Sequence, residues 1–81
     1  MIPLIRQFAG NNTTQVTVSP SLTLYFSYET CVAFRHNGEL VASQNAWSST
    51  TGKHLNAIPG YDKSEALPYE EFTGLLSEVC S

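Results

Sequence analysis

The clearest alternation of apolar and polar residues runs from Leu22 to Arg35. One parity carries apolar side chains: Leu22, Leu24, Phe26, Tyr28, Val32 and Phe34. The other parity carries Thr23, Ser27, Glu29 and Arg35. Because a strand places alternate side chains on opposite faces, this pattern predicts one buried face and one wetter face. The alternation weakens at Tyr28-Glu29-Thr30, where we expect a bulge or turn to divide the run into two strands.

Further strands flank this run. His36-Asn37-Gly38 predicts a tight hairpin, since Asn-Gly tolerates positive φ at both central positions. Its partner strand would run from Glu39 to about Trp47, with Leu40, Ala42 and Ala46 in alternation. Thr14 to Val18 is rich in β-branched residues and predicts a short strand. Met1 to Phe8 fits a short strand or one helical turn, because Pro3 blurs the pattern. We therefore expect an antiparallel meander of three or four strands.

Two helices are predicted after the strands. Hydroxyl residues at positions 48–51 are typical of a helix start, and Thr51, Leu55 and Ile58 share one helical face. A short helix over Ser49 to Ile58 would end at Pro59-Gly60, with Trp47 packed against its start.

The second helix begins near Pro68, with Glu70 and Glu71 at the positive end of its dipole. Its apolar stripe comprises Phe72, Leu75, Leu76, Val79 and Cys80. This amphipathic helix should cover one face of the sheet. The sequence thus predicts a single α+β domain over residues 1–81.

The charge of the chain changes this picture in one respect. Only 14% of the 81 residues are charged, where about 25% is usual. Such a surface suits a homodimer or a protein-binding face, although it also falls within the variation of short chains. The net charge is −3, with five acids and one base after Gly60. No basic stripe exists, so nucleic acid is a less favoured partner.

The two cysteines, Cys31 and Cys80, are too few for a secreted disulfide scaffold, and we expect both thiols to be free. Met1 to Phe8 lacks the continuous apolar core of a signal peptide, and nothing approaches a membrane span. The expected location is the cytoplasm.

No catalytic or metal constellation emerges from the sequence. The spacing of Cys31, His36, His54 and Cys80 matches no zinc pattern. Cys31 could pair with a histidine as a nucleophile, but no base and orienting group can be named with it. We therefore expect no enzyme activity, no metal and no cofactor.

The hydroxyl-rich stretch Ser49 to His54 permits two interpretations. A helix start with hydroxyls, a glycine and Lys53 could bind an anion, although it lacks the pattern of a phosphate-binding loop. The alternative is a capped helix start with no ligand. The aromatic residues Tyr25, Trp47 and Tyr61 could stack on bases, but core or interface positions are more usual for them.

Two stretches resemble a family of small proteins of unknown function from phages, other mobile elements and archaea. The first is Ser27-Tyr28-Glu29-Thr30-Cys31-Val32-Ala33-Phe34, and the second is Trp47-Ser48-Ser49-Thr50-Thr51-Gly52-Lys53-His54-Leu55-Asn56. The polar signature of these stretches marks either a binding site or a hydrogen-bonded structural joint. Its candidate binding residues are Tyr28, Thr30, Trp47, Thr50, Thr51, Lys53, His54 and Asn56.

The resemblance implies a source, a short viral or mobile-element reading frame, but no function. Together with the lack of a catalytic constellation, it leads us to expect a phage-encoded, non-enzymatic binding protein that acts on a host macromolecule in the host cytoplasm. Inhibition of host defence, as by anti-CRISPR proteins, is the expected class of activity. A nucleic-acid or nucleotide-binding accessory protein using Ser49 to His54 is one alternative, and a structural virion component is another. A host or phage protein is the expected partner, and self-association is a further expectation.

Overall fold

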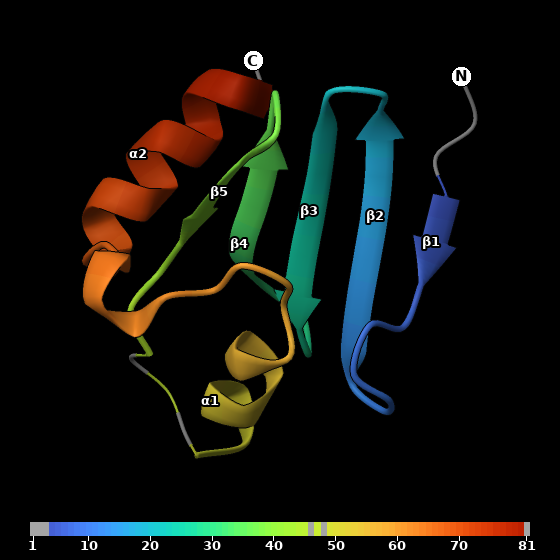
Figure 1. Ribbon diagram of the computed structural model, residues 1–81, viewed down its shortest axis with the longest axis vertical. Coiled ribbons are helices and arrows are strands. Elements are labelled where there is room, and N and C mark those ends of the chain that lie inside the picture. Colours follow the sequence, from blue (N-terminus) through green and yellow to red (C-terminus); the bar gives the residue numbers. More distant parts are fainter. Residues whose placement is uncertain (1–3, 46, 48, 81) are drawn as a thin grey trace.

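A computed structural model describes residues 4–45, 47 and 49–80 and shows an α+β fold built on one antiparallel sheet (Figure 1). Its five strands lie in sequence order, so the sheet is a simple meander. They are β1 (Leu4–Arg6), β2 (Thr13–Ser19), β3 (Leu22–Ser27), β4 (Thr30–His36) and β5 (Glu39–Ala42). The expectation of three or four strands was too low, because the segment blurred by Pro3 forms β1 and pairs with β2.

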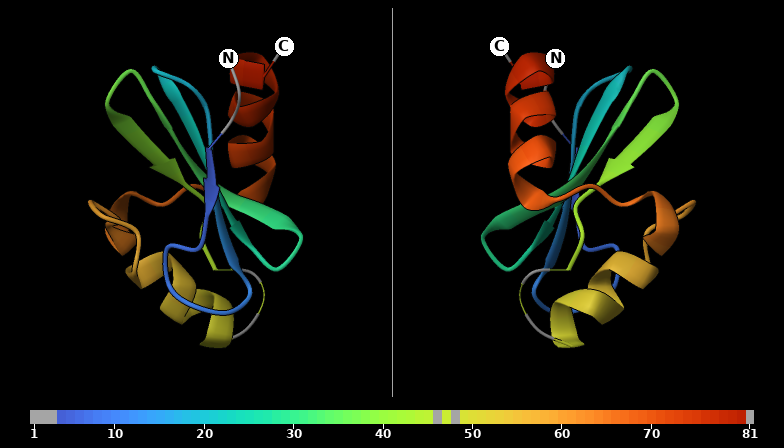
Figure 2. Two further views of the ribbon diagram at one scale, coloured as in Figure 1. Left: turned by 90° about the vertical axis from the view of Figure 1, so that its right-hand side faces the viewer. Right: turned by 90° about the vertical axis from the view of Figure 1, so that its left-hand side faces the viewer.

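The two helices lie on opposite sides of the sheet (Figure 2). Helix α1 spans Ser49–Asn56, a short 3₁₀ helix η1 spans Lys63–Glu65, and α2 spans Tyr69–Cys80. Helix α1 therefore ends two residues before the predicted Ile58. η1 was not predicted; Asp62 caps it by accepting a hydrogen bond from the backbone N–H of Ser64. In Figure 1 neither helix overlaps β1 or β2, so that half of the sheet has no helix above or below it.

A row of apolar side chains crosses all five strands on the α2 side of the sheet. The strand register aligns Ile5, Val16, Leu24, Phe34 and Val41. Side chains directly opposite one another in a sheet project to the same face. Helix α2 covers this row at β4 through Phe72. The ring of Phe72 is fully buried and lies 5.7 Å from that of Phe34.

The stripe predicted on α2 is confirmed in part. Phe72 is buried, and Leu76 and Val79 are half-buried against the same cluster. Leu75 and Cys80 are exposed, however. The difference arises because α2 rests on the sheet along a narrow line, so only the residues closest to β4 lose contact with solvent.

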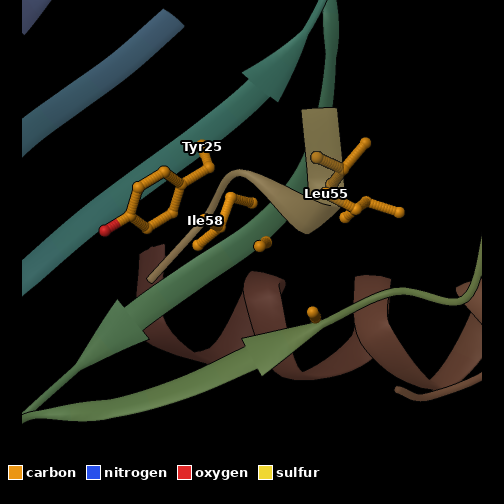
Figure 3. Packing of buried hydrophobic residues seen from close by; sticks show 6 residues of the cluster. Tyr25, Leu55 and Ile58 are labelled. Carbon is orange, nitrogen blue, oxygen red and sulfur yellow. The ribbon is translucent and has the colours of Figure 1, made fainter. Parts of the chain in front are cut away.

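A second core lies on the α1 side of the sheet (Figure 3). Tyr25 projects from β3 and packs with Leu55 and Ile58 of the α1 segment. Val32, Ala33 and Ala42 complete this core. The predicted helical face is confirmed for Thr51 and Leu55, which are buried on α1, whereas Ile58 is buried but lies two residues after the helix ends.

The prediction that only one face of the Leu22–Arg35 run is buried was wrong. Tyr25 and Ser27, on the parity expected to be wetter, are buried under α1. A shift in register between Tyr25 and Phe26 also places Val32 in the α1-side core, opposite to Phe34. Because a bulge adds one residue to a strand, it reverses the side-chain parity beyond it.

Two turns lie where the sequence predicted them. Asn37 and Gly38 have φ of 52° and 86°, as the hairpin requires. A two-residue turn at Tyr28-Glu29 divides the long run into β3 and β4. The strand after the Asn37-Gly38 hairpin is shorter than predicted, because β5 ends at Ala42 and Ser43 then forms a parallel bridge with Leu67. Ala46, placed in that strand by the sequence pattern, lies outside the described residues.

Within the described part of the chain, neither helix combines the length and apolar character needed to cross a membrane.

Candidate functional site

A buried network of hydroxyl and imidazole groups joins the end of β3 to α1. The Ser27 Oγ atom lies 2.7 Å from Nδ1 of His54 and 3.1 Å from Oγ1 of Thr51. All three residues are buried. A hydroxyl donates one hydrogen bond and accepts others, so Ser27 can bond both partners at once. The network ties two segments that lie 24 and 27 residues apart in the sequence.

The helical repeat explains why α1 contributes these particular residues. Thr51 is three positions before His54 and four before Leu55, so all three lie on the side of α1 that faces the sheet, and Ile58 is buried just after the helix ends. Leu55 and Ile58 occupy the apolar core, while Thr51 and His54 meet Ser27 at the end of β3. The polar network is therefore a continuation of the α1-side core.

Tyr28 follows Ser27 and has an unusual backbone conformation. Its φ is +56°, a left-handed value that is rare for a bulky residue and costs about 1–2 kcal/mol. Its side chain is half exposed, with the ring centroid 5.8 Å from that of His54. Two-residue hairpins with positive φ at the first position but not at the second usually have glycine at the first, and here Glu29 at the second has no positive φ. A tyrosine is thus held, at a backbone cost, where its ring can reach solvent.

A small cavity opens beside this network. It has a volume of about 160 Å³ and is lined by Ser27, Tyr28, Thr30, Val32, Trp47 and Thr51. Trp47 also packs edge-to-face on Tyr69 at the start of α2, with 5.2 Å between ring centroids. The sequence-based expectation that Trp47 packs against the start of α1 did not foresee this contact. We call Tyr28, Trp47 and Tyr69 the aromatic surface, because each is at least 40% exposed.

The remaining predicted site residues lie elsewhere. Thr50 and Lys53 are exposed on α1 and line none of the described cavities. Asn56 borders a separate cavity of about 420 Å³ with Gly52, Tyr61 and Lys63. The structure thus brings together Tyr28, Thr30, Trp47, Thr51 and His54, and separates them from the other three. Ser48, which would cap α1, lies outside the described residues.

A family model matches residues 4–74, and its description reads "Family of unknown function (DUF8033)". The chain belongs to this family. The match spans the whole sheet, both segments of the polar signature and the first half of α2. No curated protein and no solved structure matches the chain. In this member of DUF8033, the site must therefore be understood from its own geometry.

Sequence reasoning missed two residues of the site in this DUF8033 chain. Ser27 was assigned to the wetter face by its parity, although it begins the first signature stretch and stands at the centre of the network. Tyr69 was given no role, and its contact with Trp47 joins positions 22 residues apart. The position of Ser27 in the first signature stretch could have marked it as a site residue. No local sequence pattern marks Tyr69 in this way.

Cys31 is not suited to act as a nucleophile. Burial raises the pKa of its thiol to about 11, so very little thiolate exists at neutral pH. Both cysteines are free, and Cys80 is exposed near the end of α2. Among the described residues, no three His, Cys, Asp or Glu side chains cluster closely enough to hold a metal ion.

This contrast predicts selective alkylation. Iodoacetamide at pH 8 should modify Cys80 of the folded protein at least tenfold faster than Cys31, because alkylation requires an accessible thiolate. Peptide mass spectrometry over a time course would measure both rates. In urea the two rates should converge. Equal rates in the folded protein would contradict the buried position of Cys31.

Proposed function

We propose that this chain is a non-enzymatic module that binds a protein partner through the aromatic surface. The observation that carries the proposal is that Tyr28 and Trp47 line one small cavity and Tyr69 packs on Trp47, with all three rings exposed. Tyrosine and tryptophan are the residues most enriched where interfaces gain their binding energy. Packed aromatic side chains also lose little conformational entropy on binding, and Trp47 is already held against Tyr69.

The Ser27–His54 pair supports a structural role rather than nucleophilic catalysis. Ser27 is only 2% exposed although it borders the cavity, so its hydroxyl offers almost no surface to a substrate carbonyl. Its oxygen is also shared with Thr51. A serine nucleophile needs an exposed oxygen beside donors that stabilise the developing oxyanion. We infer that the pair instead fixes the turn that carries Tyr28.

The sequence resemblance supports a proposed source for the module, and the proposed target extends from that source. On that basis we propose a phage or mobile-element protein that binds a host macromolecule in the host cytoplasm. Inhibition of a host defence system, as by anti-CRISPR proteins, is the activity that best fits a small binding module without catalytic groups. The anion-binding alternative is less well supported, because Thr51 and His54 point toward Ser27 while Thr50 and Lys53 are exposed elsewhere. Self-association remains a prediction.

The variant Tyr28→Gly separates binding from folding. Relief of the left-handed strain, about 1–2 kcal/mol, should largely offset the roughly 0.5–1 kcal/mol entropy cost of glycine and the lost ring contact. The free energy of unfolding should therefore change by less than about 1 kcal/mol. Affinity for the partner should fall at least tenfold, because a central interface tyrosine typically contributes more than about 1.4 kcal/mol.

The measurement begins with affinity capture from host lysate, and the captured protein is then purified for titration calorimetry. Trp47→Ala should reproduce the loss of affinity. Val18→Ala is the matched control, because Val18 is another exposed apolar residue but lies on β2, away from the aromatic surface. If Tyr28→Gly and Trp47→Ala both bind like the wild type, the aromatic surface is not the interface.

A further inference from the structure

We infer that the 160 Å³ cavity receives one uncharged, ring-sized side chain from a basic segment of the partner protein. This inference rests on the proposed function and specifies which part of a partner the aromatic surface recognises. The size of the cavity is the first argument. A protein cavity of about 150 Å³ accommodates benzene, so this one matches a single phenyl or phenol group.

The lining of the cavity indicates an uncharged occupant. The lining comprises the exposed aromatic residues Tyr28 and Trp47, the half-buried Thr30, and Ser27, Val32 and Thr51, which are at most 3% exposed. None of these six residues carries a charge that could pair with a buried ion. A charge placed there would lose its hydration without compensation, which is strongly unfavourable. Of the hydroxyl groups, those of Ser27 and Thr51 are already hydrogen-bonded to each other.

The charges near the aromatic surface favour a basic partner. Glu29 follows Tyr28 in the β3–β4 turn, and Glu70 and Glu71 follow Tyr69 in the first turn of α2. All three acids are exposed. Two bases of the described residues lie nearby: the exposed residue Arg6 lines a separate cavity with Tyr28 and Glu29, and Lys53 is two positions from Thr51 on α1, about 200° around the helix from the cavity wall. The three acids still outnumber the bases around the aromatic surface. Complementary charges steer association and disfavour wrong partners.

The same charges argue against a flipped nucleobase as the occupant. Rings on either side of a slot can stack on a base, and hydroxyl groups can bond its edge. Nucleic acid also needs cations along the phosphate backbone, however. Acids adjoin two of the three aromatic residues, and the chain as a whole has a net charge of −3. A protein side chain flanked by lysine or arginine fits both the cavity and its surroundings.

Three pentapeptides test this inference directly. The first has tyrosine between pairs of lysines, the second has tyrosine between pairs of glutamates, and the third has alanine between pairs of lysines. In ¹H–¹⁵N NMR titrations, the first should shift the amide signals of Thr30, Val32 and Thr51. It should bind at least fivefold more tightly than the second, and the third should give no saturable shifts at these positions. A single-stranded oligonucleotide should not compete with the first peptide.

A cavity-filling variant completes the test. Thr30→Leu should occupy the cavity and weaken binding of the first peptide at least fivefold. Thr17→Leu, the same change on β2 outside the cavity lining, should have no effect. Equal binding of the lysine–tyrosine and lysine–alanine peptides, or stronger binding of the oligonucleotide, would overturn the inference. If the partner protein needs Trp47 but tolerates Thr30→Leu, the cavity inference fails while the proposed function stands.

Discussion

Replacing Phe72 with alanine should lower the free energy of unfolding by about 3–5 kcal/mol. Phe72 is completely buried, and its ring lies 5.7 Å from that of Phe34 and 6.2 Å from that of Tyr69. It is the buried residue through which α2 packs on the sheet. A chain of 81 residues has a total stability of about 4–12 kcal/mol. Loss of this ring should therefore unfold a measurable fraction of the protein at 37 °C.

Urea denaturation followed by far-ultraviolet circular dichroism measures this change. Leu75→Ala is the matched control, because Leu75 lies on the same helix but is 39% exposed. Its cost should stay below about 1 kcal/mol, as is usual for surface positions. If the two variants had equal stability, α2 would not pack on β4 as the structure shows.

The sequence was most informative where local chemistry determines the structure. Asn37-Gly38 predicts its hairpin because only certain residues tolerate positive φ at both positions. Pro68 and the two glutamates that follow locate the start of α2 to within one residue. In both cases the deciding interactions involve residues close in sequence. Residue preferences did not predict the positive φ of Tyr28, which is imposed by the short link between β3 and β4.

The sequence was least informative where distant segments pack together. Alternation in Leu22–Arg35 indicates strands but not how many faces are covered, and here two helices cover opposite faces. The bulge near Val32 then reverses the parity, which no residue type signals. For the site, the signature stretches held most of the residues that meet around the cavity. The division of α1 into inward and outward residues required the helix to be placed against Ser27.

Removing the hydroxyl of Ser27 tests whether the buried network holds α1 in place. Ser27→Ala leaves Nδ1 of His54 and Oγ1 of Thr51 without their shared partner in a buried setting. An unsatisfied buried polar group costs about 1–3 kcal/mol. We expect a loss of about 2 kcal/mol in the free energy of unfolding, measured by urea denaturation. Ser19→Ala is the control, since the Ser19 hydroxyl makes exposed hydrogen bonds with the hydroxyl and the backbone N–H of Ser21 and its loss should cost less than about 0.5 kcal/mol.

A double-mutant cycle distinguishes the network from a simple loss of packing. His54→Phe keeps a ring of similar shape but removes the nitrogen that bonds Ser27. If the bond stabilises the fold, Ser27→Ala should cost at least about 0.5 kcal/mol less in the His54→Phe background than in the wild type. Independent costs would show that the two residues do not act together. Coupled costs would show that the two residues stabilise the fold together. Because Tyr28 directly follows Ser27, the network would then hold the Tyr28 turn against α1. In that case Ser27→Ala should also weaken partner binding, even though Ser27 itself is too buried to form an extensive contact with a partner.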